Sequence, residues 1–169
     1  MDIYKPAEDS YLLKKNIINY VLSRHPKKVL DMGTGSGIIA LTFVDLGVPK
    51  VFASDINKKA LDKLKKTEKR INTIYSNLFD NIDEKFDLIS FNTPYLPVDN
   101  IKENNDPIWS GGKEFIENFL QLSKSYLTKN GCVLFTYSSK SPINIKHEII
   151  DEIKFEDSEI VYVGKFILN

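Results

Sequence analysis

A short apolar segment, residues 28–32, runs straight into three closely spaced glycines, and this junction restricts the fold more than any other feature of the sequence. The glycines stand at positions 33, 35 and 37, and a segment with helical apolar spacing continues to about Leu46. Glycine permits the positive φ angles and the close backbone approach needed where a strand turns into a helix beside a nucleotide. The junction predicts a buried strand, a ligand-binding turn and a covering helix. A tight turn with only a structural role would have the same sequence requirements.

The rest of the chain continues this alternation of strands and helices. We expect a first helix that is capped by Asp9 or Ser10 and ends at His25-Pro26. Further strands are expected at residues 51–54, 71–76, 86–91 and 132–137, and one or two more within 160–168. Further helices are expected after Asp55, around residues 144–152, and along the helically spaced Phe115, Ile116, Phe119, Leu120 and Leu127, with Asn130-Gly131 as the turn that follows. This order predicts a parallel sheet with helices on both faces, in one domain spanning residues 1–169.

The composition restricts the class of protein. Hydrophobic residues make up 42% of the chain and charged residues 27%, as in ordinary soluble globular proteins. No apolar run approaches the roughly 18 residues that a membrane span needs, so we expect no membrane association. Cys132 is the single cysteine and is interpreted as a core residue; without a disulfide or a secretory signal, a reducing, cytoplasmic location is expected. His25 and His147 have no ligand cluster around them, which predicts surface positions and no metal site.

The charge distribution argues against direct nucleic-acid binding. The 23 basic residues balance 23 acidic ones, so the chain has no global field that would hold a polyanion. Basic residues nevertheless gather along one predicted helix and just after it: Lys58, Lys59, Lys63, Lys65, Lys66, Lys69 and Arg70. This group is either a solvated helix face or a docking patch for an acidic or RNA-bearing partner.

Two polar segments stand directly after predicted strands. Asp55 can accept both hydroxyls of a ribose as hydrogen bonds, although Asp55 or Asn57 could also cap the following helix. The run Asn-Thr-Pro-Tyr at residues 92–95 follows the strand at residues 86–91. Open α/β sheets bind their ligands at the carboxyl ends of the strands, so residues 92–95 are expected to face a ligand.

These segments resemble the motifs of class I S-adenosylmethionine-dependent methyltransferases. The glycine run after Asp31 resembles the first motif of that family, and Ser-Asp-Ile-Asn at residues 54–57 resembles the second. Residues 92–95 resemble the Asn-Pro-Pro-Tyr motif of members that methylate planar nitrogens. The resemblance implies a Rossmann-like α/β fold with a mostly parallel sheet of the seven-strand type and a short C-terminal hairpin. It also implies S-adenosylmethionine as cofactor and S-adenosylhomocysteine as product.

The chemistry of a planar nitrogen gives residues 92–95 definite roles. The nitrogen lone pair is delocalised into the adjacent π system, so the site must turn it toward the methyl group. The Asn92 side-chain oxygen and the Thr93 backbone carbonyl can each accept one N–H, while Tyr95 stacks on the planar group. No metal or general base is required. Thr93 replaces the usual proline but keeps the carbonyl, and Pro94 still favours extended angles, so we expect Thr93→Pro to be neutral or activating.

Two more segments narrow the resemblance. Residues 4–10 and 108–112 look like segments of the short HemK-like methyltransferases of eukaryotes and archaea, which methylate the glutamine of the Gly-Gly-Gln motif in class-one translation release factors. Trp109 is interpreted as either a substrate-facing aromatic or a packing anchor. Asn77 stands where relatives often have aspartate, and an asparagine can still bond an adenine edge. Matching positions imply cofactor contacts from Ser10, Asp31, Gly33, Gly35, Asp55, Asn77 and Asn92.

Two other functions remain open from the sequence. An adenine N-methyltransferase could use the same asparagine, carbonyl and aromatic ring, although neutral charge and short length argue against a nucleic-acid enzyme. A catalytically weak cofactor-binding subunit is favoured only by Thr93. The resemblance also implies a heterodimer with a small zinc-binding activator of the Trm type. That partner would cover the third strand, residues 71–76, at one edge of the sheet.

Overall fold

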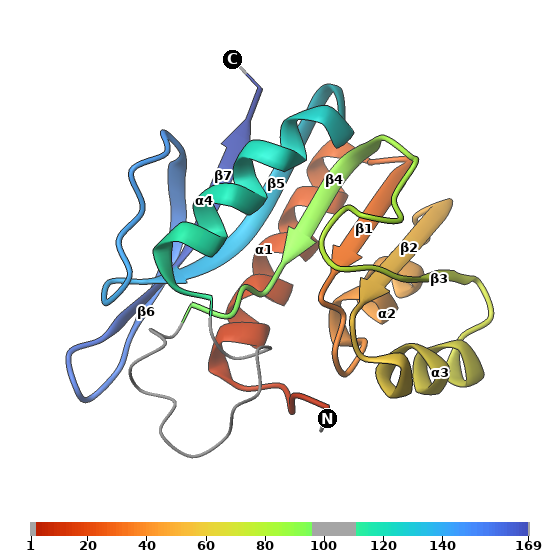
Figure 1. Cartoon of the computed structure of the whole chain (residues 1–169), viewed down its shortest axis with the longest axis horizontal. Helices are drawn as coiled ribbons and strands as arrows, with labels where there is room; N and C mark the ends of the chain where they lie inside the picture. The colour runs from red at the N-terminus through yellow and green to blue at the C-terminus, as the bar shows by residue number, and fades with distance from the viewer. Residues whose placement is uncertain (1–2, 96–110, 169) are drawn as a thin grey trace.

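The computed structural model describes residues 3–95 and 111–168, in which seven strands form one sheet (Figure 1). The strand order is β3-β2-β1-β4-β5-β7-β6. β1 to β5 pair in parallel, and β7 pairs antiparallel with β5 and β6. The strands are β1 (Lys28–Met32), β2 (Lys50–Asp55), β3 (Ile71–Tyr75), β4 (Phe86–Phe91), β5 (Leu127–Ser138), β6 (Glu148–Lys154) and β7 (Ile160–Ile167). This confirms the mostly parallel, Rossmann-like sheet with a C-terminal hairpin.

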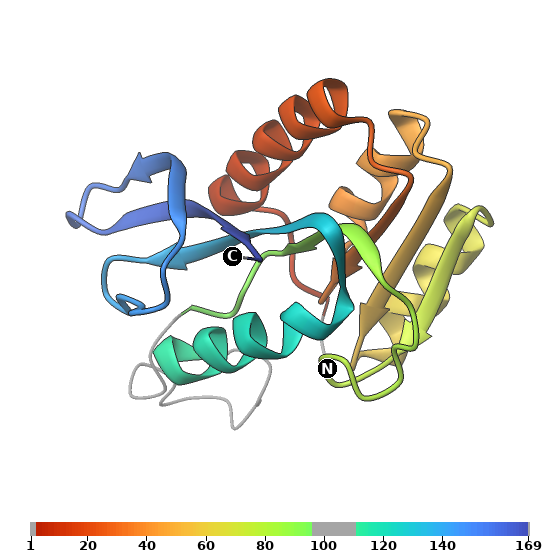
Figure 2. The same cartoon turned by 90° about the horizontal axis from the view of Figure 1, so that it is seen from above.

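Helices cover both faces of the sheet. α1 (Glu8–Arg24) and α2 (Ile38–Asp45) lie on one face and α4 (Gly112–Ser123) on the other, as the view from above shows (Figure 2). α3 (Lys58–Thr67) adds Leu64 to the same core cluster as α1 and α2, and a short 3₁₀ turn, Lys124–Tyr126, links α4 to β5. Consecutive residues of β4 pack on opposite faces of the sheet: Leu88 packs with residues of α1 and α2, whereas Ile89 packs with residues of α4. Burial on both faces explains why the central parallel strands are almost continuously apolar.

The first helix begins two or three residues earlier than the sequence predicted. Ala7, not Asp9 or Ser10, is its N-cap residue, and the Ser10 hydroxyl accepts a hydrogen bond from the Ala7 N–H at 3.5 Å. The helix ends as predicted at His25, which has the left-handed φ of 50° and is exposed. Ser10 therefore still contributes to the helix start from the third position of the helix, and Asp9 accepts the Ser10 N–H at 2.6 Å, although neither is the N-cap residue.

Three predictions about the C-terminal half are wrong. Residues 144–152 do not form a helix; β6 (Glu148–Lys154) occupies most of them as an edge strand. Ile150 and Ile153 of β6 pack against the core while the strand pairs with β7, so tertiary pairing overrides the local helical spacing. Leu127 belongs to β5, and Asn130-Gly131 lies within that strand, at an irregularity where Leu127 pairs with Phe86 and Cys132 with Leu88.

The two histidines differ in environment. His25 is exposed, as expected, whereas His147 is half-buried and its Nε2 lies 2.8 Å from the Tyr137 hydroxyl oxygen. The His147 ring also packs edge-on against Tyr137, with 5.1 Å between ring centroids, because the β6–β7 hairpin brings it over β5. The surface prediction for His147 is therefore wrong. Cys132 is buried, as predicted. Trp109 lies outside the described residues.

Candidate active site

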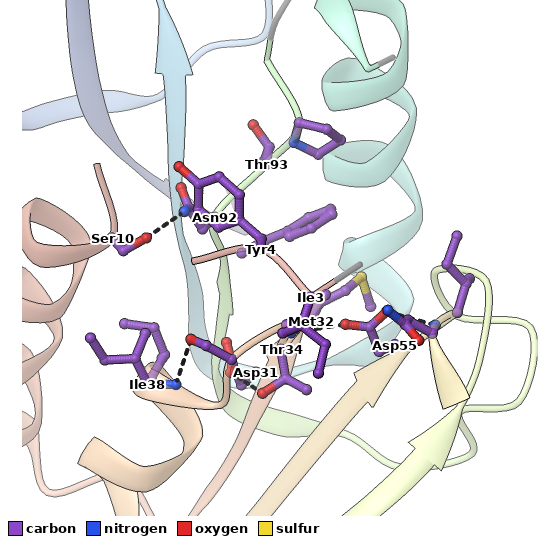
Figure 3. A pocket seen from close by; sticks show the side chains of 18 of the residues that line it. Ile3, Tyr4, Ser10, Asp31, Met32, Thr34, Ile38, Asp55, Asn92 and Thr93 are labelled. Carbon is purple, nitrogen blue, oxygen red and sulfur yellow. Dashed lines mark hydrogen bonds between the residues drawn. The ribbon is translucent and has the colours of Figure 1, made fainter. Parts of the chain in front are cut away.

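A cavity of about 430 Å³ opens at the carboxyl ends of the parallel strands (Figure 3). Every residue that the sequence assigned to the site lies in its lining: Ser10, Asp31, Gly33, Gly35, Asp55, Asn77, Asn92, Thr93, Pro94 and Tyr95. Apolar walls come from residues that the sequence did not single out, including Met32, Ile56, Leu78, Phe91 and Phe115. The volume suits a small-molecule ligand, and the few polar groups within an apolar lining are typical of such sites.

Glycines shape the loop between β1 and α2 because side chains would not fit there. Gly33 has a φ of +60°, and a Cβ at this position would lie 2.7 Å from Cε2 of Phe91. Gly37 has a φ of +84°, and its Cβ would lie 2.6 Å from Cδ1 of Leu64. Positive φ and close packing together demand glycine at both positions. The loop can thereby turn tightly between β1 and α2 beside the cavity.

Asp31 braces this loop from within the protein. It is 2% exposed, and its carboxylate accepts hydrogen bonds from the Thr34 hydroxyl at 2.7 Å, the Ser90 hydroxyl at 3.1 Å and the Ala40 N–H at 3.2 Å. Burial raises the pKa of Asp31 to about 7, and the three hydrogen bonds oppose that shift. Asp31 thus has a structural role in addition to its place in the cavity lining.

Asp55 links the loop to the second strand. Its Oδ2 accepts from the Gly35 N–H and its Oδ1 from the Asn57 N–H, both at 2.8 Å. Asn57, not Asp55, is the N-cap residue of α3, because its side chain accepts from the Lys59 N–H at 3.1 Å. Each carboxylate oxygen can accept a further hydrogen bond, so Asp55 retains acceptors for two ribose hydroxyls.

The Asn92 carboxamide is held from both ends. Its Nδ2 donates to Oδ2 of Asp9 at 3.2 Å and to the Ser10 hydroxyl at 3.1 Å, while its Oδ1 accepts from the Thr136 hydroxyl at 2.7 Å. An ionised carboxylate only accepts hydrogen bonds, so Asp9 requires the NH₂ end of Asn92 to face it. Figure 3 shows the bond from Ser10 to Asn92 at the rim of the cavity.

Asp9 is the centre of a polar cluster that sequence reasoning missed. The hydroxyls of Tyr4 and Tyr95 both donate to its Oδ2, at 3.0 and 3.3 Å. Burial raises the pKa of both tyrosines above the ordinary value, and the nearby Asp9 charge adds to the effect, so they remain donors. The segment at residues 4–10 contained the signal, but only the fold shows that it meets residues 92–95.

Thr93 has contacts that a proline could not make. Its N–H donates to the Thr136 hydroxyl at 3.1 Å, and its own hydroxyl donates to the Thr136 carbonyl at 2.6 Å. Both bonds are buried, and Thr93 is only 3% exposed. The expectation that Thr93 and proline differ only in backbone stiffness is therefore wrong.

Thr93→Pro should instead destabilise the protein. It removes two buried donors and leaves the Thr136 carbonyl without this partner, at a cost of roughly 2 kcal/mol or more in the free energy of unfolding. Chemical denaturation of the wild-type and variant proteins measures this difference. Thr93→Val, which keeps the N–H and loses the hydroxyl, should fall between the two. A Thr93→Pro protein as stable as the wild type would show that these hydrogen bonds contribute little.

The fold and the cavity together define a Rossmann-like class I methyltransferase domain. The chain belongs to the family described as Methyltransferase small domain, which matches residues 10–165. A Methanocaldococcus jannaschii protein with the provisional name protein N5-glutamine methyltransferase is 32% identical, over 99% of this chain and 93% of that protein. The release factor glutamine methyltransferase of Borreliella burgdorferi is 31% identical, over 76% of this chain and 51% of that enzyme.

A solved structure supports the same fold. The ribosomal protein L11 methylase of Lactobacillus delbrueckii subsp. bulgaricus superposes with a TM-score of 0.69 at 20% identity, covering 98% of this chain and 81% of that one. The family identifies S-adenosylmethionine as the cofactor, as the sequence predicted. The cavity fits this molecule, because Gly33 and Gly35 in its lining carry no side chains, Asp55 offers acceptors for ribose hydroxyls, and Ile56 and Leu78 offer apolar surface for a base.

Asp31 should make cofactor affinity depend on pH. The cofactor is a cation at its sulfonium and ammonium groups, and a cation beside Asp31 favours the ionised carboxylate. Because the pKa of Asp31 is raised to about 7, lowering the pH from 8 to 6 should protonate it and weaken binding, by up to about tenfold per pH unit. Calorimetric titration across this range measures the effect.

The matched controls for this pH dependence are Asp31→Asn and Asp45→Asn. Asp31→Asn should bind more weakly at pH 8 and lose most of the pH dependence. Asp45 is exposed on α2, so Asp45→Asn should keep the wild-type profile. Equal pH profiles for all three proteins would show that Asp31 does not titrate in this range.

Proposed function

We propose that the chain methylates the side-chain amide nitrogen of the glutamine in the Gly-Gly-Gln motif of a class-one translation release factor. The observation that carries the proposal is the orientation of Asn92 at the rim of the cofactor cavity. Its NH₂ end is committed to Asp9 and Ser10, so its oxygen is the end available to accept an N–H from a substrate. That oxygen accepts one bond from Thr136 and has capacity for a second.

The residues at positions 92–95 then act on the amide by orientation. S-adenosylmethionine, when bound, would supply the methyl group, which would leave its sulfur for the target nitrogen. Asn92 Oδ1 and the Thr93 carbonyl each accept one N–H of the target amide, which turns the nitrogen lone pair out of conjugation and toward the methyl carbon. Tyr95 stacks on the planar amide, and its hydroxyl bond to Asp9 limits rotation of the ring. The amide proton leaves to water once the new C–N bond has formed.

Names of relatives support the choice of substrate. The archaeal relative is named for N5-glutamine methylation, and several bacterial relatives are named release factor glutamine methyltransferases. The chain spans about half the length of those bacterial enzymes. The 169 residues form one methyltransferase domain in this proposal, because all seven strands in the described residues belong to a single sheet. The proposed location is the cytoplasm, where the translation machinery works. Within the described residues, no helix is both long and apolar enough to cross a membrane.

Labelled S-adenosylmethionine tests the proposal. The chain should transfer label to a class-one release factor, and the label should disappear when the glutamine of Gly-Gly-Gln becomes alanine. Single- and double-stranded oligonucleotides should remain unlabelled, because a flipped adenine needs phosphate contacts from a basic surface and the chain has a net charge of zero. Adenine labelling without release factor labelling would reverse the choice of substrate. Cofactor binding without transfer to any acceptor would favour a catalytically weak subunit.

We also propose that a small zinc-binding activator of the Trm type pairs with β3. This strand lies at one edge of the sheet, as predicted, and Tyr75 at its carboxyl end is 50% exposed. Unpaired N–H and C=O groups on an edge strand can bind another chain by strand addition. The alternative is an edge that its charged neighbours Lys69 and Arg70, both exposed just before β3, protect from pairing.

Co-expression tests the partner. Co-purification with a Trm-type activator should raise yield and activity, and Thr73→Pro should abolish the complex because proline cannot donate to a strand ladder. Asp62→Asn, at an exposed position of α3, is the matched control and should leave the complex intact. Monodisperse, fully active protein prepared without a partner would argue against the heterodimer.

A further inference from the structure

Thr136 contacts both residues that supply acceptors in the proposed reaction, Asn92 and Thr93. The register between β4 and β5 pairs Phe91 with Phe135, so the next residues, Asn92 and Thr136, meet just beyond the paired ends. The Thr136 hydroxyl donates to Asn92 Oδ1 at 2.7 Å and accepts from the Thr93 N–H at 3.1 Å. Its carbonyl accepts from the Thr93 hydroxyl at 2.6 Å. One side chain therefore contacts the carboxamide of Asn92 and the backbone of Thr93.

The buried position makes this contact rigid. Thr136 is 0% exposed, and β7 flanks it, with Val163 as its antiparallel partner. A single hydroxyl proton satisfies the arrangement, since the hydroxyl donates to Asn92 and accepts from Thr93. Solvent does not compete for these bonds as it would at an exposed site. The geometry fixes the carboxamide plane between Asp9 on one side and Thr136 on the other.

Orientation of the Asn92 carboxamide decides whether the site attracts or repels the target nitrogen. The oxygen end accepts an N–H, whereas the NH₂ end would place one donor against another. We propose that Thr136 is a positioning residue for methyl transfer, acting through Asn92 and through the backbone of Thr93. This inference rests on the proposed function, because Asn92 and Thr93 have their roles only in that reaction. Thr136 touches neither substrate nor cofactor in this mechanism and so changes turnover without forming their binding sites.

Two substitutions separate the hydroxyl from the volume of the side chain. Thr136→Val keeps the shape and removes the hydroxyl, whereas Thr136→Ser keeps the hydroxyl. We expect Thr136→Val to lower kcat by about 10- to 100-fold while the Kd for S-adenosylmethionine changes by less than about threefold. Thr136→Ser should retain kcat within about threefold of the wild type. The measurements are labelled-methyl transfer to release factor and calorimetric titration of the cofactor.

A double-mutant cycle tests whether Thr136 acts through Asn92. If it does, adding Thr136→Val to Asn92→Ala should lower kcat much less than it does in the wild-type background. A purely structural role would give a multiplicative loss and would lower cofactor affinity in parallel with kcat, whereas a lower melting temperature is expected in either case because the buried Thr93 N–H loses its acceptor. Wild-type kcat in Thr136→Val, equal losses in the valine and serine variants, or a fully multiplicative cycle would each overturn the inference.

A structural measurement keeps this inference separate from the proposed function. Wild-type and Thr136→Val proteins would be crystallised with S-adenosylhomocysteine, and the Asn92 carboxamide compared. A rotated or displaced carboxamide supports the positioning role even if the wild-type protein leaves release factor unlabelled, which would refute only the proposed substrate. An unmoved carboxamide in the valine variant would overturn the positioning role whatever the substrate is.

Discussion

Replacing Asn92 with alanine should reduce methyl transfer by roughly 10²–10³-fold, the scale expected for losing one preorganised polar contact at a reacting centre. The variant loses the oxygen that is held toward the substrate by Asp9 and Thr136. Cofactor binding should remain measurable, because Asp55 and the glycine loop do not depend on the Asn92 side chain. Single-turnover transfer of labelled methyl groups measures the loss, and calorimetry measures the remaining affinity.

The control for this variant is Asn19→Ala. Asn19 is exposed on α1, far along the helix from the residues that line the cavity, so its loss should change neither transfer nor affinity. An Asn92→Ala protein with a near wild-type rate would remove the orientation mechanism, and with it the role of the Thr93 carbonyl as second acceptor. A loss of cofactor binding equal to the loss of rate would move Asn92 from catalysis to cofactor binding.

Replacing Asp55 with alanine should abolish measurable cofactor binding. The substitution removes the acceptors for two ribose hydroxyls and also frees the Gly35 and Asn57 N–H groups, so the loop between β1 and α2 loses a brace and the cavity loses a contact. Hydrogen bonds to a charged acceptor contribute about 1.5–3 kcal/mol each, which for two bonds corresponds to a loss of 100-fold or more in affinity. Calorimetric titration measures it, and circular dichroism checks that the sheet is intact.

Asp55→Asn distinguishes the two parts of this effect. Asparagine can keep one acceptor, but its NH₂ end would oppose either the Gly35 or the Asn57 N–H, so affinity should still fall strongly. Asp62→Asn, at an exposed position of α3, is the matched control and should bind like the wild type. Unchanged affinity in Asp55→Ala would exclude Asp55 from the cofactor site.

The lysine-rich segment remains a separate question from the site. Its helix, α3, is capped by Asn57, which lines the cavity beside Asp55. The basic side chains from Lys58 to Lys66 are exposed along the helix. Asn92 follows β4, and in the sheet β1 lies between β4 and β2, the strand that ends at Asp55. A basic surface on α3 therefore stands nearer the Asp55 end of the cavity than the Asn92 end. That arrangement gives no support to a nucleic-acid groove around the target nitrogen.

The sequence by itself determined the parallel half of the fold. Strands β1 and β4 begin and end at the predicted residues, because strands buried on both faces need continuous apolar runs that are bounded by polar residues. Gly33 and Gly37 could be predicted because the turn needs positive φ at both positions, a local requirement that glycine meets. The close packing of Gly33 against Phe91 and of Gly37 against Leu64, in contrast, follows from the fold.

The tertiary structure decided what depends on partners distant in the chain. β6 is a strand because β7 supplies its hydrogen bonds, although its residues have helical spacing. Thr93 matters through Thr136, 43 positions away, and Asn92 is oriented by Asp9, 83 positions away. No periodic pattern in the sequence predicts such hydrogen-bond partners, because they are set by strand order and register. Residues that line the cavity could therefore be named from the sequence, while the Asp9 cluster and the contacts that orient Asn92 could not.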